Sequence, residues 1–163
     1  MTVNPSQAPV PALDDTDWAI LEQLQQEARI SLSELGRRVN LSPSATTERV
    51  RNLESAGVIT GYHATVDLSK VGYPVLAVVR LKYPGNRHDP LRRLLAERRE
   101  ILECLRTTGD DCYTLKIAAT SMEHLETLVD ELAGFGSTTT SVVYRRTLPL
   151  RGPARPAVST DPR

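Results

Sequence analysis

The sequence predicts an α+β protein whose two halves differ in how their apolar residues repeat. Residues 13–60 place apolar side chains three and four positions apart, which is typical of amphipathic helices. Residues 74–148 follow the order strand, helix, strand, strand, helix, strand, which is typical of the ferredoxin-like βαββαβ fold. We therefore expect a disordered leader at 1–12, a helical domain at 13–60, an extended wing or linker at 61–73, a ferredoxin-like domain at 74–148 and a disordered basic tail at 149–163.

The first helix is expected to begin after Asp14, because a carboxylate suits the N-cap position. Trp18, Leu21 and Leu24 recur at helical spacing, and Ile20 broadens the apolar stripe. This helix would form the floor beneath the motif that follows.

Residues 31–57 are typical of two short helices joined by a tight turn. The residues that mark the caps, the close crossing and the turn are Ser31 with Glu34 (a capping-box spacing), Gly36, Asn40, Ser42 with Pro43, and Gly57. Asn40 tolerates a left-handed backbone, and Gly36 leaves room for the second helix to cross. The extended run at 58–68, with a kink at Gly61, fits either the wing of a winged helix-turn-helix or a hinge.

The second helix of this pair has an apolar face and a polar face. Thr46, Val50 and Leu53 point inward, and the segment from Arg29 to Leu53 carries five arginines against two glutamates in a chain that is neutral overall. A short polar helix of this kind fits the major groove of DNA. The expected DNA contacts are Ser44, Thr47, Glu48 and Arg51 for base edges, Arg37, Arg38 and Arg49 for phosphates, and Ser42 at the helix start. An ordinary helical hairpin with a solvated face is the alternative.

The second half supplies the sheet. Its expected elements are strands at 74–83, 101–108, 112–119 and 137–147, a helix from Asp89-Pro90 to about Glu100, and a helix capped by Thr120 with Glu123. Depending on register, Val78 or Val79 and Val142 or Val143 lie on the sheet face that the helices leave open. An open apolar face usually marks an interface, and a second copy of the chain would fill it and present two recognition helices.

Composition limits the class of protein. Hydrophobic residues make up 40% and charged residues 25% of the chain, which is typical of a soluble globular protein, and no apolar run is long enough to cross a membrane. We expect a cytoplasmic protein. Cys104 and Cys112 lack metal-ligand spacing, so reduced thiols are expected and no metal or cofactor is predicted.

The stretch LDDTDWAILEQLQQEARISLSELGRRVNLSPSATTERVRNLESAGVITGYHATVD resembles the DNA-binding half of the Lrp/AsnC (leucine-responsive, or feast/famine) transcriptional regulators. The later stretch TTGDDCYTLKIAA resembles the amino-acid-sensing (RAM) domain of the same family, so the resemblance covers about Leu13 to Leu148. It implies a dimer through the sheets, further assembly to tetramers or octamers, and a pseudo-palindromic duplex operator. Two positions depart from the family pattern: Trp18 stands at a usually charged position, and Thr46 replaces a typical aliphatic residue.

The resemblance also implies a small effector, an amino acid, bound between dimers near the hairpin. The matching residues are Gly109, Asp110 and Asp111 in the hairpin and Thr139 and Ser141 on the last strand. A carboxylate can hold the ammonium group, and the amides of a glycine turn can receive the carboxylate. Taken by themselves, the three hairpin residues are better explained as a simple turn, and only the resemblance to the family favours a ligand contact.

Two other functions share part of this sequence pattern. An architectural DNA-binding protein without an effector would share the helix pair. The sirohaem decarboxylases resemble this two-domain architecture, but His63, His88 and His124 are scattered without ligand spacing, so we expect no enzyme.

Overall fold

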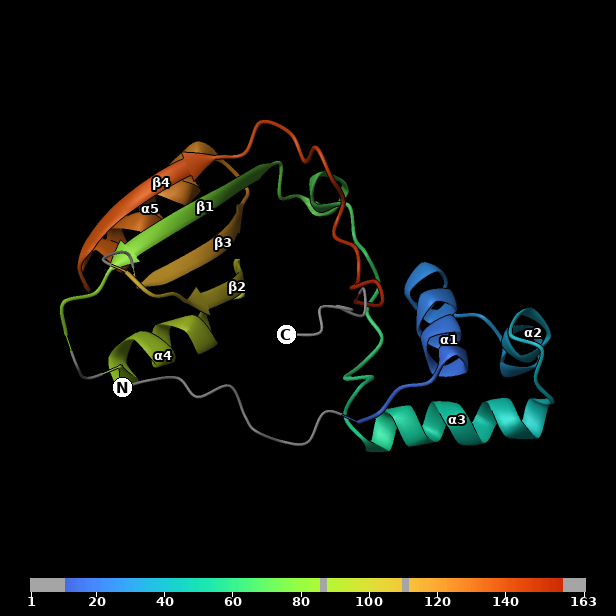
Figure 1. Ribbon diagram of the computed structural model, residues 1–163. Helices are drawn as coiled ribbons and strands as arrows, with labels where there is room; N and C mark the ends of the chain where they lie inside the picture. The colour runs from blue at the N-terminus through green and yellow to red at the C-terminus, as the bar shows by residue number, and fades with distance from the viewer. Residues whose placement is uncertain (1–10, 86–87, 110–111, 157–163) are drawn as a thin grey trace. The chain divides into compact units, whose positions relative to one another are not determined.

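The computed structural model describes residues 11–85, 88–109 and 112–156 of the chain (Figure 1). The chain divides into two compact units. The helical unit contains the residues up to Ala64 together with those from Pro149 onward, and the sheet unit is Thr65–Leu148. The chain therefore leaves the helical unit once, builds the sheet unit and returns.

The helical unit contains the three predicted helices, α1 (Asp15–Gln26), α2 (Leu32–Arg38) and α3 (Pro43–Ser55). They bury a common core of Ile20, Leu35, Val50 and Leu53. Ile20 is the fully buried residue of α1, whereas Trp18 stays half-buried outside this core. The stripe predicted from Trp18 is therefore wrong at that residue.

The predicted caps hold, with one correction. Asp14 accepts a hydrogen bond from the Asp17 amide at 2.8 Å, and Asp17 accepts one from the Asp14 amide, so the reciprocal capping box lies at α1. At α2, Ser31 accepts from the Glu34 amide at 3.1 Å. The carboxylate of Glu34 does not return this bond, because two arginines of α2 bind it instead.

The segment after α3 is extended but pairs with no strand among the described residues. The amides of Val58 and Ile59 donate to the Leu53 carbonyl oxygen, and both side chains pack against the helical core. A short 3₁₀ helix, η1 (Leu68–Val71), follows and ends at Gly72 with φ of 91°. Residues 58–67 therefore do not form the hydrogen-bonded ladder with another described strand that a paired wing strand would form.

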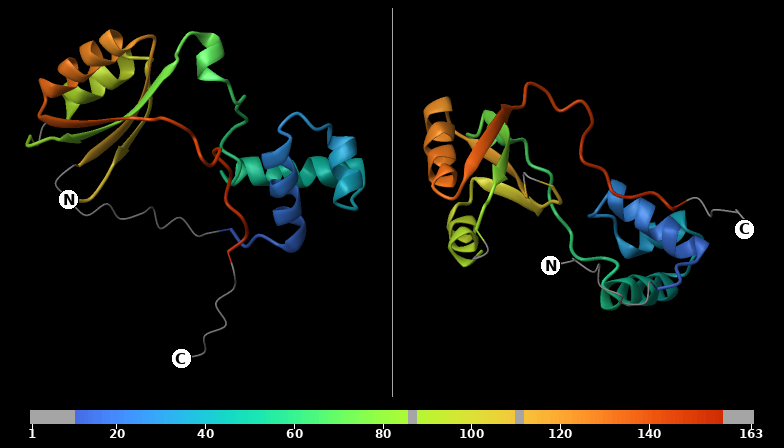
Figure 2. Two further views of the ribbon diagram at one scale, coloured as in Figure 1. Left: turned by 90° about the horizontal axis from the view of Figure 1, so that it is seen from above. Right: turned by 60° about the vertical axis from the view of Figure 1, so that its left-hand side comes forward.

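The sheet unit has the predicted ferredoxin-like order. Its elements are β1 (Val75–Lys82), α4 (Asp89–Glu97), β2 (Ile101–Arg106), β3 (Tyr113–Ala119), α5 (Met122–Ala133) and β4 (Ser137–Val142). The strands form one antiparallel sheet in the order β2-β3-β1-β4. Figure 2 shows α4 and α5 on one face of this sheet.

Three predicted boundaries are wrong. The last strand ends at Val142 rather than at residue 147. The N-cap of α5 is Ser121, which accepts from the His124 amide at 3.1 Å, and not Thr120. Asp89 is the first residue of α4 rather than its cap, and His88 at the cap position makes no capping bond through its side chain.

The strand register decides which side chains lie on the open face. Ala77, Val79 and Leu81 are fully buried under the helices, together with Leu115 and Ile117 of β3. Val78 pairs with Lys116 and Ser141 and points the other way. The open face therefore carries Val78 and Val143, while Val79 and Val142 lie on the helix-covered side.

Candidate nucleic-acid interface

Close crossing of α2 and α3 depends on Gly36. A Cβ atom at this position would lie 2.6 Å from Thr46 Oγ1 and 2.8 Å from the Leu41 carbonyl oxygen, closer than real contacts allow. Thr46 is fully buried, and its hydroxyl donates to the Ser42 carbonyl oxygen at 2.9 Å. The threonine that departs from the family pattern is thus accommodated without an unsatisfied hydroxyl.

The turn and the start of α3 follow the sequence. Asn40 has φ of 57°, the left-handed conformation predicted for the turn. Ser42 accepts from the Ala45 amide at 3.3 Å and lies 3.1 Å from the Ser44 hydroxyl. Thr47 donates to the Pro43 carbonyl oxygen at 2.8 Å. These hydroxyls hold the first turn of α3 in place and keep acceptor lone pairs for a ligand.

Glu48 and Arg51 lie one turn further along α3, and both are exposed. Neither side chain makes a hydrogen bond or ion pair with any other described residue. Arg51 is therefore a cation whose five N–H donors are available to a ligand.

The three arginines expected at phosphates are engaged within the helical unit. Arg37 binds Glu34 through two hydrogen bonds of 2.8 and 2.7 Å. Arg38 contacts Glu34 at 2.9 Å and Glu27 at 3.2 Å. Hydrogen bonds from Arg37 and then Arg38 lower the pKa of Glu34 to about 2.

Arg49 is held by the start of α1. Its guanidinium lies 2.7 Å from the Asp14 carboxylate and 2.9 Å from that of Asp17. The Asp17 amide, followed by Arg49, lowers the pKa of Asp14. These partners are 32 and 35 residues from Arg49, so no local spacing in the sequence indicates them.

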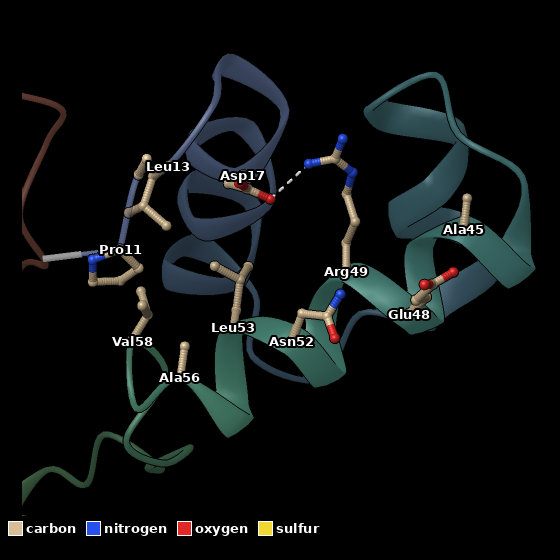
Figure 3. A pocket seen from close by; sticks show the side chains of 11 residues that line it. Pro11, Leu13, Asp17, Ala45, Glu48, Arg49, Asn52, Leu53, Ala56 and Val58 are labelled. Carbon is tan, nitrogen blue, oxygen red and sulfur yellow. Dashed lines mark hydrogen bonds and ion pairs between the residues drawn. The ribbon is translucent and has the colours of Figure 1, made fainter. Parts of the chain in front are cut away.

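Figure 3 shows Arg49 directed toward Asp17 across a groove of about 450 Å³ between α3 and the segment that leads into α1. Leu13, Leu53 and Val58 form its apolar end, and Asn52 and Arg49 belong to its polar end. The sequence did not predict this groove. Arg49 lines this groove, whereas Arg51 is not among its lining residues.

The helical unit is less basic than the segment from Arg29 to Leu53 suggests. Residues 11–64 carry five arginines but eight carboxylates, because the acids of α1 lie outside the stretch counted from Arg29. Attraction to DNA must therefore come from particular exposed side chains rather than from the net charge of the unit.

The residues expected at an effector lie in the sheet unit. Gly109 is exposed with φ of 99°, and Asp110 and Asp111 lie outside the described residues. Thr139 pairs with Arg80 and Ser141 with Val78, so both hydroxyls lie on the open face of β4. Strands β3 and β1 separate β4 from β2, which leads into the hairpin. Within one chain, Gly109 and the two hydroxyls are therefore not brought together.

A polar cluster that the sequence did not indicate lies beside the hairpin strands. The Tyr113 hydroxyl and His88 Nδ1 share a hydrogen bond of 2.8 Å, and Arg106 donates to His88 Nε2 at 3.3 Å. Burial raises the pKa of the Tyr113 phenol. His124 binds Thr120 instead, so these two histidines serve separate contacts.

The described part of the chain contains neither a cluster of metal ligands nor a membrane-spanning helix. No three His, Cys, Asp or Glu side chains in it gather closely enough to hold a metal ion. No helix in it has both the length and the apolar character needed to cross a bilayer.

Comparison with known proteins identifies the two parts. Residues 13–60 match the winged helix-turn-helix DNA-binding family, and residues 76–152 match the Lrp/AsnC ligand-binding domain. The transcriptional regulator LrpC of Bacillus subtilis is 37% identical over 132 residues, covering 81% of this chain and 92% of LrpC. The chain belongs to the Lrp/AsnC family. It is therefore a DNA-binding transcriptional regulator of the Lrp/AsnC type, with the α+β fold predicted from its sequence.

Solved Lrp/AsnC-like structures agree with this fold. The structure of B. subtilis LrpC has a TM-score of 0.79 at 36% identity and covers 83% of this chain and 96% of its own. The feast or famine regulatory protein of Mycobacterium tuberculosis, complexed with L-methionine, has a TM-score of 0.82 at 30% identity, covering 88% of this chain and 100% of that one. The regulator NMB0573 of Neisseria meningitidis, also complexed with L-methionine, has a TM-score of 0.79 at 28% identity, with 85% and 94% coverage.

Proposed function

We propose that this Lrp/AsnC regulator reads specific duplex sequences by placing α3 in the major groove. The observation that carries the proposal is that Arg51 and Glu48 are exposed on a capped helix without partners among the described residues. Arg51 can bind a guanine edge through two hydrogen bonds, and Glu48 can accept from cytosine. Ser44 and Thr47 add hydroxyl contacts beside them, and Ser42 fixes the start of the helix.

The proposed phosphate contacts are Arg37, Arg38 and Arg49. When DNA binds, each of these arginines must share its guanidinium between carboxylate and phosphate, or exchange one for the other. An exposed ion pair contributes little free energy, so Arg37 can exchange its carboxylate for a phosphate at little cost. The pair of Arg49 with Asp17 is partly buried and costs more to exchange. The proposed phosphate contacts would therefore add affinity and salt dependence rather than sequence selectivity.

A dimer through the open sheet faces is proposed as the unit that reads DNA. Val78 and Val143 lie on that face, together with Leu76 and the half-exposed Leu105 of β2. Two copies present two α3 helices, which suit half-sites about 34 Å apart in a pseudo-palindromic operator. Tetramers or octamers would be built from such dimers. Because this activity requires the chromosome, we place the protein in the cytoplasm.

An amino acid is the proposed effector. The ligand-binding domain matched at residues 76–152 supports a small ligand, and two similar proteins are complexed with L-methionine. The proposed contacts are Gly109, Asp110, Asp111, Thr139 and Ser141. Because Gly109 and the two hydroxyls lie apart in one chain, the pocket would be shared between subunits.

The architectural alternative predicts DNA binding without an effector response, and an enzyme of the sirohaem-decarboxylase type predicts turnover of a tetrapyrrole. No cofactor or catalytic residue is part of our proposal. LrpC and NMB0573 are transcriptional regulators, which supports a non-enzymatic role.

Selection from a random duplex library tests the proposed reading of DNA. Purified protein is equilibrated with the library at physiological salt, and bound sequences are recovered over several rounds. We expect enrichment of a motif with two related half-sites. Recovery of sequences that match the starting library would contradict sequence-specific reading and favour the architectural alternative.

A further inference from the structure

The C-terminal segment returns to the helical unit and contacts α1. Gln25 Nε2 donates to the Pro153 carbonyl oxygen at 3.3 Å, and the Arg155 guanidinium pairs with the Asp15 carboxylate. Gly152 lies against the Gln25 side chain, whose amide oxygen occupies the space where a Cβ atom would be. These contacts belong to the helical unit, in which residues from 149 onward are grouped.

The segment and the helix are matched in charge. Helix α1 carries three carboxylates and no lysine or arginine, with Asp15 and Glu22 exposed on the outer side. Residues 149–156 carry two arginines and no acid. Leu150 to Ala154 and the side of α1 formed by Glu22, Gln25 and Gln26 enclose a shallow groove of about 440 Å³.

The composition of the segment favours docking at small entropic cost. Three of its eight residues are prolines, which fix φ and shrink the ensemble of the free segment. Pro153 and Arg155, which make the two polar contacts, lie beyond the residues matched to the Lrp/AsnC ligand-binding domain. The docking contacts therefore lie outside the matched ligand-binding domain.

We propose that residues 149–156 are a releasable strap that docks on the acidic side of α1 and gives the helical unit a second connection to the sheet unit. The first connection is the extended stretch through residue 64, which lacks a sheet partner. With the strap docked, the helical unit is tethered at both crossings of the chain. With the strap released, only the first crossing restrains it.

The contacts that dock the strap are weak. The side chains of its ion pair are 46% and 87% exposed, so the pair is screened by salt and shifts the docking equilibrium by about fivefold at most. Such a contact opens and closes readily, and modest changes in ionic strength or partner binding can shift its population.

Trypsin cleavage of the Arg151–Gly152 bond measures docking in the full-length protein. Native-state cleavage follows the population of the released segment, and the Arg155–Pro156 bond resists trypsin. We expect Arg155→Glu and Asp15→Arg each to speed cleavage by about three- to fivefold, and the double swap Asp15→Arg/Arg155→Glu to restore the parent rate. Arg93→Glu, on the exposed side of α4, is the matched charge control and should not change the rate. Equal rates in all variants, or a swap that fails to restore protection, would overturn docking.

Amide ¹⁵N relaxation of the same proteins tests the tether. In Arg155→Glu, we expect the rotational correlation time of residues in α1–α3 to fall relative to that of the sheet unit, with recovery in the double swap. An unchanged ratio despite faster cleavage would show that the segment docks without restraining the unit, which would overturn the strap. Neither measurement involves DNA or an effector, so both outcomes are independent of the proposed function.

Discussion

The arginines of the helical unit differ in whether a carboxylate of the same unit already binds them. Arg51 has no partner among the described residues, whereas Arg37 is bound to Glu34 by two hydrogen bonds. We expect Arg51→Ala to cost about 1–3 kcal/mol on the selected operator and to relax selectivity at one base pair. Arg37→Ala should weaken all duplexes alike and lower the salt-dependence slope by about 1. Fluorescence titration with operator and scrambled duplexes at several salt concentrations distinguishes a base contact from a phosphate contact. An equal loss on both duplexes for Arg51→Ala would make it a phosphate contact.

Glu34 gives the fold a specific pH dependence. Its pKa is lowered from 4.5 to about 2 by Arg37 and Arg38, so the folded state prefers the ionised form. The resulting stabilisation is fully present above pH 4.5 and is lost as the pH falls toward 2. We expect the melting temperature of Glu34→Gln, measured by circular dichroism, to change less with pH within this window than that of the parent protein. Glu48→Gln, which removes an exposed carboxylate without an ion pair among the described residues, is the control and should keep the parent slope. A parent slope in Glu34→Gln would contradict this role.

At the scale of elements, local signals predicted most of the fold. Ser42 with Pro43 marked the start of α3, and Gly57, with φ of 69°, marked its end, because caps depend on residues within one turn. The partnership of Arg49 with Asp14 and Asp17 could not be predicted, because it depends on how α1 packs against α3. The choice between Val78 and Val79 likewise needed the register, since a shift of one residue reverses every side chain.

The two glycines of the helix pair should resist substitution by alanine for different reasons. Gly36→Ala places a methyl group against Thr46 and the Leu41 carbonyl, and such overpacking costs about 1–3 kcal/mol. Gly57→Ala meets no atom within 4 Å but must hold φ of 69°, which costs about 1–2 kcal/mol. Urea denaturation measures both changes. When each variant is combined with Thr46→Ala, the changes in unfolding free energy should not add for Gly36→Ala, because residues 36 and 46 are in contact. They should add for Gly57→Ala, which is not in contact with Thr46. Additivity in both pairs would contradict the close crossing.

At the scale of the whole molecule, neighbouring residues of β4 should differ in their effect on effector binding. Thr139 lies on the open face opposite Arg80, whereas Thr140 lies on the helix-covered side opposite Val79. A ligand at 100 times its dissociation constant stabilises the folded protein by about 2.7 kcal/mol. In a thermal-shift screen of the amino acids, we expect Thr139→Val to reduce the stabilisation by the best ligand and Thr140→Val to leave it unchanged. Equal responses in the two variants would place the effector away from the open face.

Dimerisation and operator recognition are linked through the same open face. Val78→Asp places a carboxylate in the proposed apolar contact. Burying this carboxylate and its cross-strand neighbour Lys116 is costly, so the dimer should dissociate. Each monomer would keep its α3 helix and bind a single half-site with parent affinity. The whole operator would lose the avidity of two linked helices, a factor of about 10² to 10⁴. Sedimentation velocity and titrations with half-site and whole-site duplexes measure both effects, with Ala96→Asp on the exposed side of α4 as the control. A Val78→Asp protein that remains dimeric would rule out this face, whereas a monomer with full operator affinity would rule out the need for two helices.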